Sequence, residues 1–224
     1  MENRKGLDIR NLIVRTLSAI CLIPLVTYAI LANTELFYAA LGFVVVIMVV
    51  ECYGMIKNLS SKWIWSIVAL IYVSLFGFSF CWIRNQEGGR PLLLWITVTA
   101  WTSDTGAFIF GRLIGGPKLA PKISPAKTWA GLIGAVIFAC ATGAIFYRHL
   151  NISNVYNFIG IASTFGIIGQ LGDLLESWIK RKAHIKDSGK IIPGHGGILD
   201  RVDSLVLCSV VLAICLALFK KKLF

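Results

Sequence analysis

Residues 36–56 read LFYAALGFVVVIMVVECYGMI, a run of 21 residues with one charged side chain, Glu51. A helix needs about 20 predominantly apolar residues to cross a hydrocarbon core roughly 30 Å thick. The rest of the chain has the same character, since 57% of its 224 residues are apolar, 15% are charged and the mean hydropathy is +0.76. Soluble domains average about 45–50% apolar and 25% charged residues. The composition therefore indicates a polytopic integral membrane protein.

Apolar runs of spanning length recur along the whole chain, and we predict an all-α fold with about seven transmembrane helices. These runs leave no room for a separate soluble domain, so any chemistry has to be built from helix ends and the loops between them. The predicted spans are residues 12–32, 36–56, 63–83, 91–111, 129–147, 155–179 and 202–219.

The net charge of +11 comes from 22 basic and 11 acidic residues. With a cytoplasmic N-terminus, alternate loops place 16 basic residues inside and 6 outside, as the positive-inside rule requires. The tail KKKLF, residues 220–224, falls outside under a count of seven helices and is the one discordant feature; a change of one helix would resolve it. The positive charge accounts for topology and for attraction to anionic headgroups, and no soluble module supports binding to nucleic acid.

Acidic residues inside the predicted spans are rare and concentrate in the second half of the chain, at Asp104, Asp173 and Glu176. A carboxylate at membrane depth costs at least about 2.5 kcal/mol, so such residues tend to be paired or functional. Asp173, Glu176 and Lys180 fall on one helical face, and a Glu176–Lys180 pair that stabilises the helix end is the alternative for Glu176. In the first half we interpret Glu51 as a snorkelling or ion-paired structural residue.

Residues 111–131, GRLIGGPKLAPKISPAKTWAG, form a basic loop with three prolines and no acid. Its last part, with Ser124, Pro125, Lys127 and Thr128, leads directly into the fifth predicted span. A helix N-terminus offers free N–H groups and the positive end of the helix dipole, which together bind phosphate. The loop is therefore a candidate anion site, with an ordinary capped, positively charged loop as the alternative.

Residues 186–204, KDSGKIIPGHGGILDRVDS, form the densest polar cluster and run into the last apolar segment. That segment, residues 205–219, is only about 22 Å long as a helix, so the helix has to begin near Asp200 to cross. Asp200 and Asp203 then share one face at the membrane surface. They could be helix-capping acids. Together with Asp173 they also form an all-oxygen set suited to Mg²⁺, which takes one or two carboxylates and adds water and phosphate oxygens.

These segments resemble the phosphatidate cytidylyltransferases, also called CDP-diacylglycerol synthases. ESWIKRKAHIKDSGKIIPGHGGILDRVDS, residues 176–204, is similar to the signature of that family at every fixed position. SDTGAFIFGR and SPAKTWAG, residues 103–112 and 124–131, look like its two upstream motifs. The chain departs from the family in two respects: Ala130 replaces the glutamate that usually precedes the final glycine of the second upstream motif, and the N-terminal half is shorter than in many members.

The resemblance implies a transfer of CMP from CTP to membrane phosphatidic acid, which gives CDP-diacylglycerol and pyrophosphate. It implies Mg²⁺ held by Asp173, Asp200 and Asp203, with a monovalent partner ion such as K⁺. We interpret His195 as a turn or hydrogen-bonding residue rather than a base. The catalytic candidates are Asp173, Lys180, Arg181, Asp200, Arg201 and Asp203, and the substrate-binding candidates are Asp104, Ser124, Pro125, Lys127, Thr128, Lys186, Asp187, His195, Gly196 and Gly197.

On this interpretation residues 1–100 are N-terminal transmembrane helices, about three spans, and residues 101–224 are the catalytic region. We expect an integral protein of the bacterial inner (plasma) membrane with a cytoplasmic active site, with membrane lipid but no nucleic acid as partner and a homodimer as a candidate assembly. The alternatives are a related membrane lipid kinase or nucleotidyltransferase, and an ion-coupled transporter. The sequence lacks the DGxxAR motif of the CDP-alcohol phosphotransferases, and a transporter should show repeated halves with polar residues at mid-span.

Overall fold

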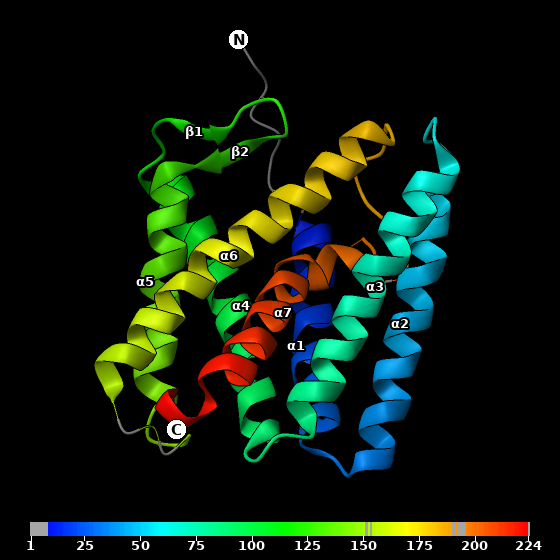
Figure 1. The fold of residues 1–224 in the computed structure, drawn as a ribbon. Coiled ribbons are helices and arrows are strands. Elements are labelled where there is room, and N and C mark those ends of the chain that lie inside the picture. The colour runs from blue at the N-terminus through cyan, green and yellow to red at the C-terminus, as the bar shows by residue number, and fades with distance from the viewer. Residues whose placement is uncertain (1–8, 151, 153, 190, 192–195, 224) are drawn as a thin grey trace.

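The computed structural model describes residues 9–150, 152, 154–189, 191 and 196–223. Within these residues the chain forms seven α-helices and one two-stranded hairpin (Figure 1). Each predicted span coincides with one helix, which confirms the predicted helical membrane fold. In chain order the elements are α1 (Ile9–Leu31), α2 (Thr34–Ile56), α3 (Lys62–Arg84), α4 (Gly89–Leu113), β1 (Lys118–Ala120), β2 (Ser124–Thr128), α5 (Trp129–Phe146), α6 (Val155–Lys182) and α7 (Leu199–Leu223).

The helices have the length and surface of membrane spans. In the described part of the chain, α2 to α7 are each long and apolar enough to cross a bilayer, and α1 adds the apolar segment Ile20–Leu31. Their outward faces carry large apolar side chains such as Phe43, Trp63 and Phe78, which are between 66% and 70% exposed. Water would disfavour this exposure, whereas lipid tails are as apolar as the side chains themselves. The chain is therefore an integral membrane protein.

The connections between helices gather at two opposite ends of the bundle (Figure 1). The α2–α3 loop, the hairpin and the C-terminal end of α6 lie at the end drawn at the top, and from there the chain runs back into the bundle to start α7. The α1–α2 and α3–α4 connections and the C-terminal end of α7 lie at the other end. The hairpin and the basic end of α6, residues 180–182, thus lie at the same end of the bundle. Residues 220–222, near the C-terminal end of α7, lie at the opposite end, where the positive-inside rule does not expect lysines.

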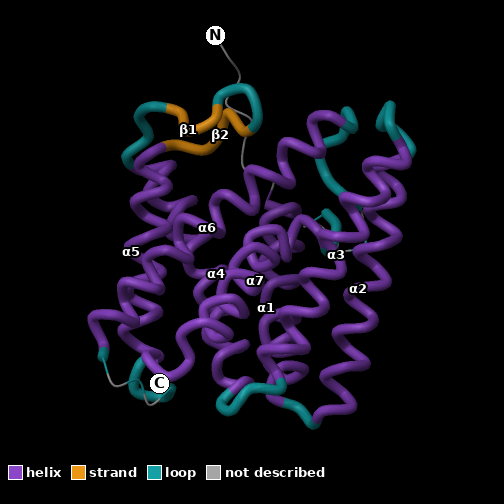
Figure 2. Tube along the Cα trace, viewed as in Figure 1, coloured by secondary structure: helices purple, strands orange, loops and turns teal. Residues whose placement is uncertain are grey.

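The hairpin was not expected from the sequence, which indicated only a basic loop. β1 and β2 pair antiparallel, with Lys118 opposite Thr128 (Figure 2). Strands of three and five residues are too short to show the alternation that identifies a strand, and Pro125 argues against one. The predicted start of the next helix is confirmed, because Thr128 is the N-cap of α5 and its Oγ1 accepts the Gly131 N–H at 3.0 Å.

Glycines let α4 and α5 approach closely. A Cβ on Gly134 would lie 2.5 Å from the Gly106 carbonyl oxygen. We therefore expect Gly134→Ala to lower the free energy of unfolding by about 1–3 kcal/mol, the usual cost of overpacking. The measurement is the midpoint of thermal unfolding in detergent. Gly42→Ala in α2 is the matched control, since its Cβ would meet no atom within 4 Å, and similar midpoints for the two variants would contradict the prediction.

Candidate functional site

A cavity of about 600 Å³ with many charged residues in its lining lies where α4, β2, α6 and α7 meet. Its volume falls in the range of ordinary small-molecule sites, roughly 300–1,000 Å³. Five aspartates and four basic side chains line it, although only 15% of the chain is charged. The charged lining consists of Asp104, Arg112, Lys127, Asp173, Lys180, Asp187, Asp200, Arg201 and Asp203.

Asp104 connects α4 to both α6 and α7. Its Oδ1 accepts a hydrogen bond from Gln170 Nε2 at 3.2 Å, and its Oδ2 accepts one from the Ser204 hydroxyl at 3.3 Å. Among the described residues no cation forms an ion pair with Asp104. Hydrogen bonds are therefore what compensates the loss of water around this carboxylate. The three residues fix the spacing of three helices beside the cavity.

Lys127 joins the hairpin to α6. Its Nζ lies 2.8 Å from Asp173 Oδ2 and donates to the Gln170 carbonyl oxygen at 3.2 Å. The other oxygen of Asp173 accepts the Ser177 hydroxyl at 3.1 Å. The charge of Lys127 thus neutralises a carboxylate here, and binding a phosphate would require Lys127 to exchange one anion for another.

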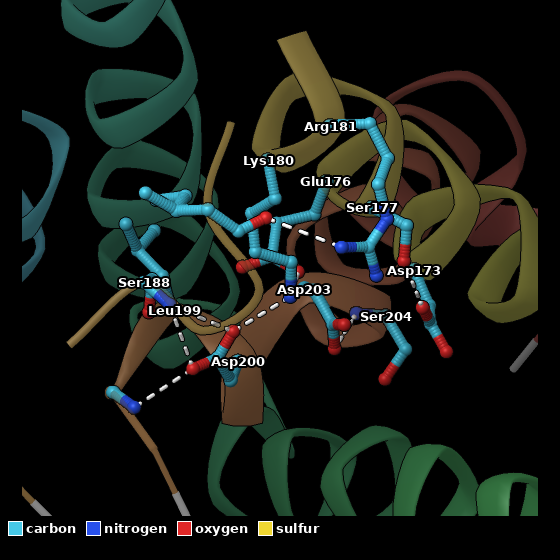
Figure 3. A network of polar contacts seen from close by, with 12 residues as sticks. Asp173, Glu176, Ser177, Lys180, Arg181, Ser188, Leu199, Asp200, Asp203 and Ser204 are labelled. Carbon is cyan, nitrogen blue, oxygen red and sulfur yellow. Dashed lines mark hydrogen bonds and ion pairs between the residues drawn. The ribbon is translucent and has the colours of Figure 1, made fainter. Parts of the chain in front are cut away.

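Lys180 is shared by two carboxylates, Glu176 and Asp200 (Figure 3). Its Nζ lies 2.6 Å from Asp200 Oδ1, and the pair with Glu176 is the helix-end pair that the sequence left open as an alternative. Asp200 also accepts the N–H groups of Gly197 at 2.8 Å and Ser188 at 3.0 Å. Lys180 is only 8% exposed, so the breaking of this cluster would leave charges uncompensated in a low dielectric. Asp200 therefore ties the end of α6 to the start of α7.

Asp203 differs from the other two predicted metal ligands. It is 7% exposed, its Oδ1 accepts the Ser204 N–H at 2.7 Å, and no cation among the described residues pairs with it. A buried carboxylate that lines a cavity without a counter-charge is a natural partner for a cation. Asp173 and Asp200, by contrast, already have lysine partners.

The carboxylates fit Mg²⁺ only if the ion takes part of its ligands from elsewhere. In the portion of the chain that the structure describes, no group of three His, Cys, Asp or Glu residues lies close enough to hold a metal. Magnesium usually binds one or two carboxylates and keeps several waters and substrate phosphate oxygens. One or two of Asp173, Asp200 and Asp203 would satisfy that requirement.

Ten of the sixteen predicted site residues line the cavity, and five lie outside its lining. Arg181, one of these five, donates to the Ile185 carbonyl oxygen at 3.2 Å and so fixes the turn after α6. His195 falls outside the described residues. The ten are Asp104, Ser124, Lys127, Thr128, Asp173, Lys180, Asp187, Asp200, Arg201 and Asp203, and the five are Pro125, Arg181, Lys186, Gly196 and Gly197.

The sequence interpretation missed two polar residues of the cavity, Arg112 and Gln170. Gln170 is 4% exposed and contacts both Asp104 and Lys127. Its position within a span, one helical turn before Asp173, was a signal that could have identified it. Arg112 is the last residue of the first upstream motif. In the sequence it could not be told apart from the other basic residues that the positive-inside rule explains.

The fold and the cavity together define the class: an integral membrane helix bundle with a charged, ligand-sized cavity between its helices. Comparison with known proteins agrees with that class and narrows it. The chain belongs to the cytidylyltransferase family, whose model matches residues 57–219. The family resemblance inferred from the motifs is thereby confirmed.

Two of the relatives match nearly the whole chain. The chain is 40% identical over 214 residues to the phosphatidate cytidylyltransferase of Rickettsia felis, and the match covers 92% of each protein. The phosphatidate cytidylyltransferase of Rickettsia conorii is 39% identical over 211 residues, with 90% of each protein covered. The protein of the same name from Brucella suis is 38% identical over 156 residues, which is 69% of this chain and 58% of that protein.

Proposed function

We propose that the chain transfers CMP from CTP to phosphatidic acid and forms CDP-diacylglycerol and pyrophosphate. The observation that carries this proposal is that residues 103–112, 124–131 and 176–204, far apart in the sequence, contribute to one charged cavity. The relatives named phosphatidate cytidylyltransferases, 40% and 39% identical over at least 90% of the chain, support the same reaction.

The reaction is a displacement at phosphorus. An oxygen of the lipid phosphate attacks the α-phosphorus of CTP and forms a P–O bond, while the bond from the α-phosphorus to the bridging oxygen breaks and pyrophosphate leaves with the electron pair. The nucleophile is already an anion, so no strong base is required. Positioning and charge neutralisation then supply most of the catalysis. Mg²⁺, when bound, supplies further neutralisation at the phosphate oxygens.

The basic residues of the cavity differ in their partners, which indicates that the lysines and the arginines have different roles. Lys127 and Lys180 are paired with carboxylates. Arg112 and Arg201 line the same cavity and have no carboxylate partner among the described residues. A guanidinium group presents several donors in a geometry that matches phosphate. We therefore assign phosphate binding first to the two arginines, and the positioning of Asp173 and Asp200 to the two lysines.

We place the active site on the cytoplasmic side of a bacterial inner membrane. The cavity lining includes residues of β2 and the C-terminal part of α4, and these elements lie at or run to the bundle end that also holds the C-terminal end of α6 (Figure 1). The positive-inside rule assigns the basic segments at this end to the cytoplasm. CTP is found in that compartment. Every residue of the cavity lining lies within residues 101–224, so we assign catalysis to this region and a supporting role to residues 1–100.

The test is an assay of the purified full chain in detergent micelles that contain phosphatidic acid, Mg²⁺ and CTP labelled in the cytidine ring. We expect a lipid-soluble cytidine product and an equal amount of pyrophosphate. Diacylglycerol in place of phosphatidic acid should give no such product. A chain that is inactive with CTP but labels diacylglycerol from γ-labelled ATP would contradict the proposal and identify a lipid kinase.

A further inference from the structure

Glu51 is a buried carboxylate of α2, 4% exposed, that does not line the cavity. It also precedes the segment matched by the family model, residues 57–219. The interpretation of Glu51 as a snorkelling residue is wrong, because its side chain turns into the protein. Within the described residues no cation pairs with it. Burial of a charge is unfavourable unless other groups compensate it. The described groups that donate hydrogen bonds to it belong to the other half of the chain.

The partners of Glu51 are the backbone at the start of α7 and one loop hydroxyl. Its Oε1 accepts the Ile198 N–H at 2.9 Å, and its Oε2 accepts the Leu199 N–H at 2.8 Å. Oε2 also accepts the Ser188 hydroxyl at 3.1 Å. Leu199 is the first residue of α7, where free N–H groups and the helix dipole both favour an anion. A side chain of α2 thus supplies the cap that the sequence of α7 would otherwise have to provide.

Glu51 and Asp200 hold the same short piece of backbone from two sides. Ser188 donates its N–H to Asp200 and its hydroxyl to Glu51. Of three consecutive N–H groups, that of Gly197 binds Asp200 and the next two bind Glu51. A shift of this backbone would therefore move Asp200 relative to Lys180.

The contact is close enough to restrict the residue at position 197. A Cβ on Gly197 would overlap the Ser188 hydroxyl and would lie 2.5 Å from Glu51 Oε1, which is closer than a non-bonded carbon and oxygen normally approach. The glycine of the signature segment therefore leaves room for the α2 carboxylate.

We propose that Glu51 is a positioning residue for the transfer reaction: it fixes the Gly197–Leu199 backbone so that the first turn of α7 presents Asp200, Arg201 and Asp203 to the cavity. The inference rests on the proposed function and adds a residue from the supporting half of the chain. Small displacements of reacting groups reduce rates by up to about a hundredfold. The proposal therefore predicts that substitution of Glu51 lowers kcat of the folded protein, and does not only lower the folded fraction.

The experiment compares Glu51→Gln with Glu35→Gln, the same change at an exposed position of the same helix. Both purified full-length variants are assayed with CTP and phosphatidic acid, and their folded fractions are measured by thermal unfolding. We expect Glu51→Gln to lower kcat per folded molecule by about 10- to 100-fold, with KM for CTP changed by less than about threefold. Glu35→Gln should match the wild type. A normal kcat for folded Glu51→Gln would overturn the proposal, even if its unfolding midpoint falls.

If Glu51→Gln does not fold, Ser188→Ala provides a second test of the same contact. It removes one donor to Glu51 and leaves the N–H bond to Asp200 in place, so we expect a kcat loss of about threefold to tenfold at an unchanged midpoint. An unchanged kcat in Ser188→Ala would then count against the proposal. If both variants fold, their effects should be less than additive, since both act through the same contact. Absence of product from the wild-type chain would instead overturn the proposed function, and the role of Glu51 in it.

Discussion

Asp200→Asn is expected to reduce CTP-dependent turnover by about two to three orders of magnitude while the chain remains folded. Loss of one preorganised charged or hydrogen-bonding group in an active site typically costs about 10²–10³ in kcat. Asp200 lines the cavity, binds Lys180 and accepts two backbone N–H groups, from Gly197 and Ser188. Asparagine keeps the shape but presents an NH₂ group where acceptors are needed, and it removes a carboxylate that we assign to Mg²⁺.

The measurement is kcat with saturating CTP and phosphatidic acid, together with the midpoint of thermal unfolding. Glu87→Gln is the matched control, because Glu87 is an exposed acid in the α3–α4 turn at the opposite end of the bundle. We expect the control to match the wild type in both measurements. Near-normal turnover in folded Asp200→Asn would refute the assignment of Asp200 to the reaction.

Lys180→Met is expected to lower the free energy of unfolding by about 3–5 kcal/mol, the usual cost of removing one partner of a buried ion pair. The side chains of Glu176 and Asp200 are 3% and 7% exposed, and Lys180 is the cation that both contact. Without it, two carboxylates face each other in a low dielectric. Methionine has a similar length and fills the space of the lysine stem, so the loss reports on charge more than on packing.

The double variant Lys180→Met/Glu176→Gln separates charge from shape. It removes one of the two carboxylate charges that lose their lysine partner. We expect it to recover at least half of the free energy of unfolding that Lys180→Met loses. Thermal unfolding midpoints in one detergent provide the comparison, with Lys122→Met, an exposed lysine of the hairpin turn, as the control. A double variant as unstable as Lys180→Met alone would show that the charge repulsion between Glu176 and Asp200 is not the cause.

The membrane helices could be predicted from the sequence because a span requires a continuous apolar run, and such runs are local. The predicted residues 36–56 and 129–147 lie close to α2, Thr34–Ile56, and α5, Trp129–Phe146. The short strands of the hairpin could not be predicted, because they carry no periodic pattern. The predicted span 155–179 stops before the end of α6 at Lys182, since residues 180–182 are charged and the part of a helix beyond the apolar run has no hydropathy signal.

Most residues that line the cavity were among the predicted site residues, but the pairing of their side chains was not predictable. Asp173, Lys180 and Asp200 could be chosen by residue type and spacing, and the structure brings all three to one cavity. Lys127 and Asp173 are 46 positions apart, so no local rule could assign them to each other. Glu51 shows the same limit more strongly, because its partners Ile198 and Leu199 lie 147 and 148 positions away.

The ion pairs inside the cavity also determine what kind of ligand it can accept. Five aspartates and four basic side chains leave the lining with a formal charge close to zero before any substrate arrives. A nucleoside triphosphate that entered as a bare polyanion would add negative charge to a lining with no surplus of positive charge. Uptake of the nucleotide together with its counter-cations avoids this cost. The lysine–aspartate pairs therefore compensate charge in the resting site, and we expect nucleotide binding to depend on the cations that accompany the nucleotide.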